Sequence, residues 1–221
     1  MKESTNRTLI TNPKNIICLG LNYADHIEET SLATHDFPEI FMKTSNALAS
    51  HQDIVPIQDE NLHYDYEGEL VIVIGKAGKN ISRDQAKEHI LGYTIGNDVS
   101  VRTLQFRGSQ WILGKSLDNF APIGPTIVSP DDFDFDNATI TTTANGEIRQ
   151  QAKLQQMMFK PDAIIEFVSQ FITLQEGDII FTGTPSGVVL GKNEKRYGWL
   201  KSGDTVSISI SGIGTLVNQF K

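Results

Sequence analysis

Cysteine is nearly absent from this chain, because Cys18 is the only one among 221 residues. A single thiol excludes an intrachain disulfide and a zinc site built from several thiolates. The sequence also lacks any apolar run that approaches the ~20 residues a membrane-spanning helix needs. Residues 1–14 are largely polar and contain no apolar core of a signal peptide. These features favour a reducing compartment, and we expect a cytoplasmic location.

Positive charge is also scarce. The chain has 27 acidic against 19 basic residues, which gives a formal net charge of −8. This balance argues against nucleic acid or an anionic membrane surface as the main partner. A small anionic substrate is not excluded, because one pocket can be positive within an acidic protein.

Helical signals are few, and strand and turn signals dominate. A hydrophobic fraction of 39% with 18 Gly and 8 Pro is typical of a folded, turn-rich protein. Asn145-Gly146 predicts a type I′ hairpin turn, and helices are expected at 82–88 and 161–171. Apolar or β-branched runs predict strands at 15–19, 41–43, 70–74, 91–95, 139–144, from 147, 178–182 and from 204 onward. Regular βαβ alternation is missing, so we expect an α+β fold with a mixed or antiparallel sheet. A lead-in of residues 1–13 would precede a single catalytic domain of residues 14–221.

Glu67 and Glu69 stand two residues apart at the start of the apolar run 70–74. Side chains at i and i+2 of a strand share a face, so the two carboxylates would lie close together. A bound divalent cation would relieve their repulsion and lost hydration; the alternative is a solvated acidic edge. Asp98, at the end of the next predicted strand, is a third candidate ligand, or else an ordinary turn aspartate. An oxygen-only set favours Mg²⁺, Mn²⁺ or Ca²⁺ over zinc.

His26 and Glu29 form a second candidate group. If this segment is helical, residues i and i+3 share a face, and Glu29 would orient His26 as a general base for water. Asp25 and Glu28 are alternative partners. The competing interpretation is an exposed amphipathic segment without a catalytic role.

Four further side chains are candidates for anion binding, with ordinary surface charge or polarity as the alternative: Lys43, Arg102, Gln105 and Lys115. Arg102 stands four residues after Asp98. Lys115 follows a segment with glycines at 108 and 114, which is suited to a mobile covering loop. The turn 183–187 would expose backbone N–H groups and the Thr184 hydroxyl to a carboxylate; the alternative is a plain tight turn.

Six motifs in this order make the chain similar to the fumarylacetoacetate hydrolase family. They are Asn22-Tyr-x-Asp-His, Tyr66-Glu-Gly-Glu-Leu, Gly96-Asn-Asp-Val-Ser-x-Arg, Gln110-Trp-x-x-Gly-Lys-Ser, Asn145-Gly-Glu and Thr182-Gly-Thr-Pro-Ser-Gly-Val. The resemblance spans about residues 16–220. The short chain resembles the single-domain branch, which includes acylpyruvate hydrolases, oxaloacetate decarboxylases and isomerase/decarboxylases of homoprotocatechuate breakdown.

The resemblance implies a rolled, mixed β-sheet with few short helices, like the C-terminal domain of fumarylacetoacetate hydrolase, in a homodimer. It implies Mg²⁺ or Mn²⁺ at the three carboxylates, with Ca²⁺ as a substitute. His26, Glu29 and Lys115 match catalytic positions of the family. Positions that contact substrate in the family are matched by Lys43, Arg102, Gln105 and Thr184.

We therefore predict metal-dependent C–C bond cleavage of a small anionic 2-oxo acid through a pyruvate enolate. The reaction would be acylpyruvate hydrolysis, oxaloacetate decarboxylation or both. The first alternative is 2-hydroxyhepta-2,4-diene-1,7-dioate isomerase or 5-oxopent-3-ene-1,2,5-tricarboxylate decarboxylase activity. The second is an inactive, metal-stabilised binding protein.

Overall fold

The computed structural model describes residues 12–30, 36–191 and 193–221. The strands are β1 Ile16–Gly20, β2 Glu39–Lys43, β3 Leu48–Ser50, β4 Ile54–Val55, β5 Tyr64–Asp65, β6 Gly68–Ile74, β7 Ile90–Asn97, β8 Ser100–Val101, β9 Ala121–Val128, β10 Thr139–Ala144, β11 Glu147–Lys153, β12 Ile179–Phe181, β13 Thr205–Ile210 and β14 Gly214–Phe220. The α-helices are α1 Ala24–Thr30, α2 Arg83–His89, α3 Arg102–Gln105, α4 Ile112–Lys115, α5 Pro161–Phe171 and α6 Glu194–Tyr197, and 3-10 turns cover Ser45–Ala47 and Leu154–Gln156. Most of the predicted lead-in, residues 1–11, lies outside the described residues.

The larger sheet has seven strands in the order β2-β1-β12-β6-β7-β9-β3 and mixes parallel with antiparallel pairs. Every residue of β6 is buried, because its apolar run lies at the centre of this sheet. β6 pairs with β7 in antiparallel register, with Gly68 opposite Asn97. The start of β6 therefore lies beside the end of β7, where the predicted carboxylate ligands stand.

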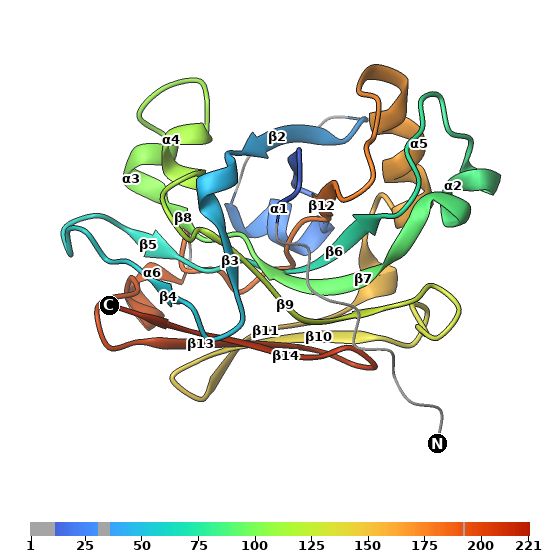
Figure 1. Ribbon diagram of the computed structural model, residues 1–221. Coiled ribbons are helices and arrows are strands. Elements are labelled where there is room, and N and C mark those ends of the chain that lie inside the picture. The colour runs from blue at the N-terminus through green and yellow to red at the C-terminus, as the bar shows by residue number, and fades with distance from the viewer. Residues whose placement is uncertain (1–11, 31–35, 192) are drawn as a thin grey trace.

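The second sheet has five strands in the order β11-β10-β13-β14-β4 and runs below the curled larger sheet in Figure 1. Its strand β10 alternates half-buried and buried residues, so one face packs into the core. Asn145 and Gly146 join β10 to β11 with φ of 52° and 82°, as a type I′ turn requires. The predicted hairpin and the predicted fold class are both confirmed.

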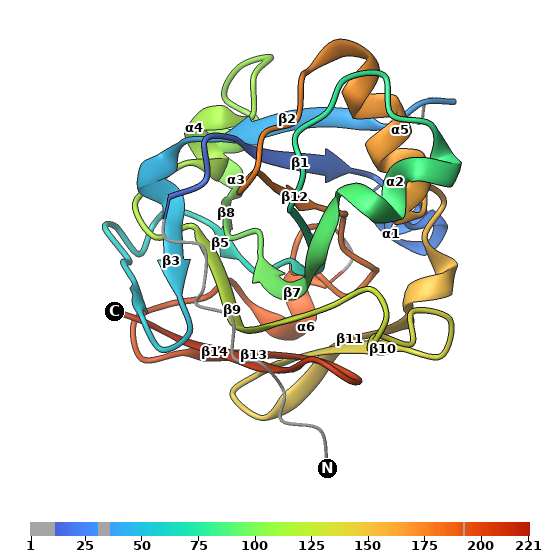
Figure 2. The same ribbon diagram turned by 45° about the vertical axis from the view of Figure 1, so that its right-hand side comes forward.

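The two predicted helices are present as α2 and α5, which lie together at one side of the molecule in Figure 2. Ser82 precedes α2 as expected, but its hydroxyl donates to the Gln85 side chain instead of capping the helix. The short helices α3, α4 and α6 were not predicted. Among the described residues, no helix is both long and apolar enough to cross a membrane.

Candidate metal centre and active site

Three buried carboxylates meet where β6 begins and β7 ends. Glu67 precedes β6, Glu69 is its second residue, and Asp98 follows β7. The Asp98 N–H donates to the Glu67 carbonyl at 2.9 Å, which fixes the two chain segments side by side. One ligand oxygen from each carboxylate lies within 4.8 Å of the others. The predicted cluster is therefore present, and none of its members is a solvated edge or an ordinary exposed turn residue.

Gly68, between the two glutamates, is required by close packing. A Cβ on Gly68 would lie 2.1 Å from the Thr142 hydroxyl oxygen of β10. The Gly68 N–H donates to Gln150 Oε1 of β11 at 3.0 Å. The second sheet thus presses directly against the backbone that carries both glutamates.

Two buried cations neutralise the outer part of the cluster. The Lys115 ammonium, at the end of α4, lies 2.7 Å from Glu67 Oε2 and 2.8 Å from Asp98 Oδ2. The Arg102 guanidinium lies 2.7 Å from Glu67 Oε1 and donates to Asp65 Oδ2 through Nε and Nη2. Burial lowers the pKa of Lys115, but the carboxylates of Asp98 and Glu67 outweigh burial and raise it overall.

The two glutamates differ in electrostatic environment. Burial raises the pKa of Glu67, but Lys115 and Arg102 outweigh burial and bring this pKa down to about 2. Burial raises the pKa of Glu69 well above its usual value, and the charges of Asp98 and Glu67 raise it further. Without a bound cation, Glu69 therefore takes up a proton more readily than Glu67.

The hydrogen bonds of the Glu69 carboxylate show whether a metal ion fits the cluster. Its Oε2 accepts the Gly183 N–H at 2.7 Å, whereas its buried Oε1 has no hydrogen-bond partner within the described chain. A buried carboxylate oxygen without a partner is unfavourable, and a hard cation supplies one. Three carboxylates with oxygen atoms this close, and no sulfur or nitrogen ligand among them, fit Mg²⁺ or Mn²⁺.

The predicted His26–Glu29 pair lies on one face of α1, with His26 Nδ1 3.5 Å from Glu29 Oε2. The Gly187 N–H donates to both Glu29 oxygens at 3.1 and 3.0 Å, and the Asn193 side chain donates to Oε1. Asp25, the alternative partner, instead accepts from the Ser186 hydroxyl at 2.8 Å. These bonds hold the Glu29 carboxylate in place beside His26.

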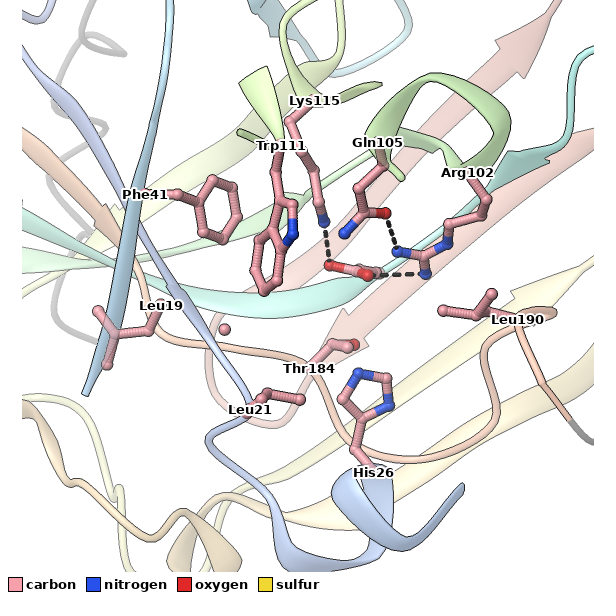
Figure 3. A pocket seen from close by; sticks show the side chains of 12 residues that line it. Leu19, Leu21, His26, Phe41, Arg102, Gln105, Trp111, Lys115, Thr184 and Leu190 are labelled. Carbon is pink, nitrogen blue, oxygen red and sulfur yellow. Dashed lines mark hydrogen bonds and ion pairs between the residues drawn. The ribbon is translucent and has the colours of Figure 1, made fainter. Parts of the chain in front are cut away.

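One pocket joins these groups (Figure 3). His26 and Thr184 lie on one side, and Arg102, Gln105 and Lys115 lie opposite them. Glu67 also lines the pocket and contacts Arg102 and Lys115. The remaining lining residues give the pocket an apolar wall: Leu19, Gly20, Leu21, Phe41, Trp111 and Leu190. Gln105 Oε1 accepts from Arg102, so its amide NH₂ is left to donate into the pocket.

Two residues matched to substrate contacts have other bonding in this structure. Lys43 is not among the lining residues of this pocket; its ammonium contacts Asp98 and donates to the carbonyls of Val99 and Phe120. The Thr184 hydroxyl donates to the Gly68 carbonyl at 2.9 Å and accepts from Gln150. Lys43 therefore contacts Asp98 without lining the pocket. The Thr184 hydroxyl fixes the turn 183–187 to the first residue of β6.

Helix α4 occupies part of the segment that was expected to form a covering loop. Gly114 lies within it, and a Cβ there would come within 2.4 Å of the Gln105 backbone nitrogen. Gly114 therefore permits close packing of α4 on α3. Gly108, in contrast, has open space around it, and Trp111 between the two glycines lines the pocket.

The sequence analysis did not identify two buried polar residues, Asp65 and Gln150, that hold parts of the site together. Buried Asp65 accepts from Arg102 and from the N–H groups of Val189 and Leu190. Buried Gln150 bonds both Gly68 and the turn that contains Thr184. The available signal for Gln150 was its place two residues before Ala152 in a predicted strand, because these two residues share the buried face of β11.

Comparison with known proteins decides the family. The family model described as fumarylacetoacetate (FAA) hydrolase C-terminal matches residues 15–221. The chain belongs to the fumarylacetoacetate hydrolase family. Members of this family with related sequences and structures carry names for several reactions.

The oxaloacetate tautomerase YisK of Bacillus subtilis is 44% identical over 211 residues, which cover 93% of this chain and 69% of the relative. The 2-hydroxyhepta-2,4-diene-1,7-dioate isomerase structure from Mycobacterium marinum has a TM-score of 0.80 and 39% identity, covering 94% of this chain and 74% of the other. The fumarylpyruvate hydrolase structure from Pseudomonas aeruginosa, in complex with Mn²⁺ and pyruvate, has a TM-score of 0.84 and 32% identity, covering 94% and 89%.

Proposed function

We propose that this family member is a divalent-metal-dependent enzyme that forms the enolate of an oxaloacetate-like 2-oxo acid, with keto–enol tautomerisation as its principal reaction. One observation carries the proposal: Glu67 of the three-carboxylate cluster and His26, which has Glu29 beside it, line the same pocket. The name of the 44% identical relative supports oxaloacetate as substrate. Tautomerisation requires proton transfer alone, without an attacking water.

Glu67, Glu69 and Asp98 would hold the cation, which supplies Lewis-acid stabilisation of negative charge at the 2-oxo group. Arg102 and Gln105 would orient a substrate carboxylate, with Arg102 held in position by Asp65. These contacts fix the carbon next to the oxo group relative to the base.

His26 would move the proton. Its Nδ1 lies toward Glu29, so Nε2 would face the substrate, remove a proton from the carbon beside the oxo group and deliver it to the enolate oxygen. The reverse transfer would convert the enol to the keto form. The apolar wall with Trp111 and Leu190 would keep bulk water from the enolate.

C–C bond cleavage is the second candidate. The same His26–Glu29 geometry suits activation of a water against the distal carbonyl of an acylpyruvate. Oxaloacetate decarboxylation would need no attacking water, because the keto form loses CO₂ and leaves the pyruvate enolate, whose charge a cation at the cluster would stabilise. The named hydrolase structure with Mn²⁺ and pyruvate supports this candidate.

A parallel assay of metal-loaded protein separates these reactions. Oxaloacetate enol decay is followed by ultraviolet absorbance, pyruvate release is measured from the same samples, and acetylpyruvate and a dicarboxylic dienol are tested beside it. Metal-dependent enol decay that exceeds pyruvate release supports the tautomerase. Metal binding without turnover of any of these substrates would refute both enzyme proposals and favour the binding protein. A homodimer and a cytoplasmic location stay predictions.

A further inference from the structure

A second cavity, of about 260 Å³, shares no lining residue with the candidate active site. Its lining residues come mainly from the β10–β11 hairpin, the end of α6 and the segment between α6 and β13. Figure 2 shows these elements in the lower part of the molecule. We name it the Arg149 pocket, and its lining residues are Tyr66, Ala144, Asn145, Arg149, Tyr197, Gly198, Trp199, Leu200, Lys201 and Asp204.

Arg149, one of the lining residues, has buried hydrogen-bond donors that are not satisfied by the described residues. Its side chain is only 10% exposed, and its guanidinium stacks on the Tyr197 ring at 3.8 Å. Nη2 faces the mostly exposed Glu147 at 3.2 Å, while Nε and Nη1 are buried and have no hydrogen-bond partner in the described part of the chain. A buried guanidinium with unmet donors is unfavourable, and an oxyanion is the partner that best matches its geometry.

The charges around Arg149 favour an anion. Lys201 adds a second cation to the lining. Asp204, the acidic lining residue, is already engaged, because it accepts from the Lys201 N–H at 2.9 Å and the Asn145 side chain at 2.8 Å. Two cations, Arg149 and Lys201, therefore stand in the lining against one carboxylate, and Glu147 faces Arg149 from outside the lining. We propose that the Arg149 pocket binds a small oxyanion, a carboxylate or a phosphate, and that its occupancy regulates the active site through Glu29.

Two short routes connect the pocket with Glu29. Tyr197, which stacks on Arg149, ends helix α6, and Asn193 immediately before this helix donates to the Glu29 carboxylate. The Tyr66 hydroxyl donates to the Gly187 carbonyl at 2.8 Å, and the Gly187 N–H donates to Glu29. Movement of either pocket wall therefore changes the position of the carboxylate that orients His26. This regulatory half of the proposal rests on the proposed function.

The binding half is tested optically and without turnover. The chain has two tryptophans, Trp111 in the candidate active site and Trp199 in the Arg149 pocket. The W111F variant therefore keeps a single tryptophan, in the wall of the Arg149 pocket. Metal-free W111F is titrated with inorganic phosphate and, separately, with malonate, against sodium chloride of equal ionic strength.

A saturable fluorescence change with either probe, absent with chloride, supports the site and tells carboxylate from phosphate. The R149Q substitution in the W111F background should weaken binding at least about tenfold, the loss expected for a charge-assisted contact. The R83Q substitution in the same background removes a charge from an exposed pair elsewhere and should leave binding unchanged. Absence of a saturable change with both probes would overturn the proposal, as would equal affinity in the R149Q variant.

Coupling is tested with the wild-type residue at position 111. The bound probe should change the KM or kcat for oxaloacetate by about fivefold or more, a typical allosteric effect, and this change should vanish in R149Q. Saturable binding without a kinetic change, in a protein that turns over oxaloacetate, refutes the coupling alone. Saturable binding in a protein that turns over none of the substrates refutes the proposed function and leaves the oxyanion site standing.

Discussion

Replacing Glu69 with Gln removes one charge from the carboxylate cluster and changes its shape very little. The amide oxygen of the substituted side chain can still accept the Gly183 N–H that Glu69 accepts at 2.7 Å. The new NH₂ group would stand where Oε1 has no hydrogen-bond partner among the described residues, facing the charges of Glu67 and Asp98. We therefore expect the metal-free variant to fold, with stability near neutral pH equal to or above that of the wild type.

Metal binding should respond in the opposite sense. Removing a residue that only supports a ligand typically weakens metal affinity about 10–100-fold, so loss of a ligand charge should cost more than about 100-fold. This ratio corresponds to about 2.7 kcal/mol at 25 °C. Isothermal titration calorimetry with Mn²⁺ measures the affinity, and thermal unfolding of the metal-free proteins measures folding.

The folding stability of the metal-free protein should also depend on pH, and the direction of each change is predicted. Because the pKa of Glu69 is raised on folding, its proton contributes stability at acid pH that is lost as pH rises above 4.5, through the folded pKa. Glu67 acts oppositely: its pKa of about 2 contributes stability at neutral pH that is lost as pH falls from 4.5 toward 2. The E69Q variant should lose only the first dependence, as measured by urea unfolding across pH. Unchanged Mn²⁺ affinity in a folded E69Q protein would refute the assignment of Glu69 as a ligand.

Three other substitutions test the site and its supports. The H26N variant should lose about 100-fold or more in kcat for enol decay while Mn²⁺ affinity measured by calorimetry stays within about twofold, and a comparable loss of affinity would contradict its role as base. The Q150L variant leaves the Gly68 N–H buried without an acceptor, so urea unfolding should show a loss of about 1–3 kcal/mol, and unchanged stability would disprove that bond's contribution. The G114A variant should lose about 1–3 kcal/mol because its Cβ meets the backbone of α3, whereas G108A, with open space around it, should not, and equal unfolding midpoints would contradict the packing argument.

Much of the fold follows from local sequence. The apolar run 70–74 is a buried strand, and the Asn145-Gly146 turn joins two strands, because both signals act within a few residues. The parallel pairing of β3 with β9 and of β4 with β14 lacks such a signal. Those short strands gain their partners from distant segments that the rest of the fold brings together.

Local sequence likewise predicted some residues of the site and not others. Side-chain alternation in a strand was enough to place Glu67 and Glu69 on one face, and helical spacing was enough for His26 and Glu29. The role of Gln150 depends on a hydrogen bond across 82 residues of sequence, which no local pattern contains. The sequence analysis favoured cleavage reactions, and the names of the relatives include both a tautomerase and a hydrolase.

The central claim is that a divalent cation at this carboxylate cluster enables enolate chemistry. The most direct test adds Mn²⁺ stepwise to metal-depleted protein while calorimetric heat and oxaloacetate enol decay are recorded on the same preparation. The account predicts that activity is lost on depletion and returns in step with binding of a single ion per chain at the cluster. Full enol decay by the metal-depleted protein would contradict it.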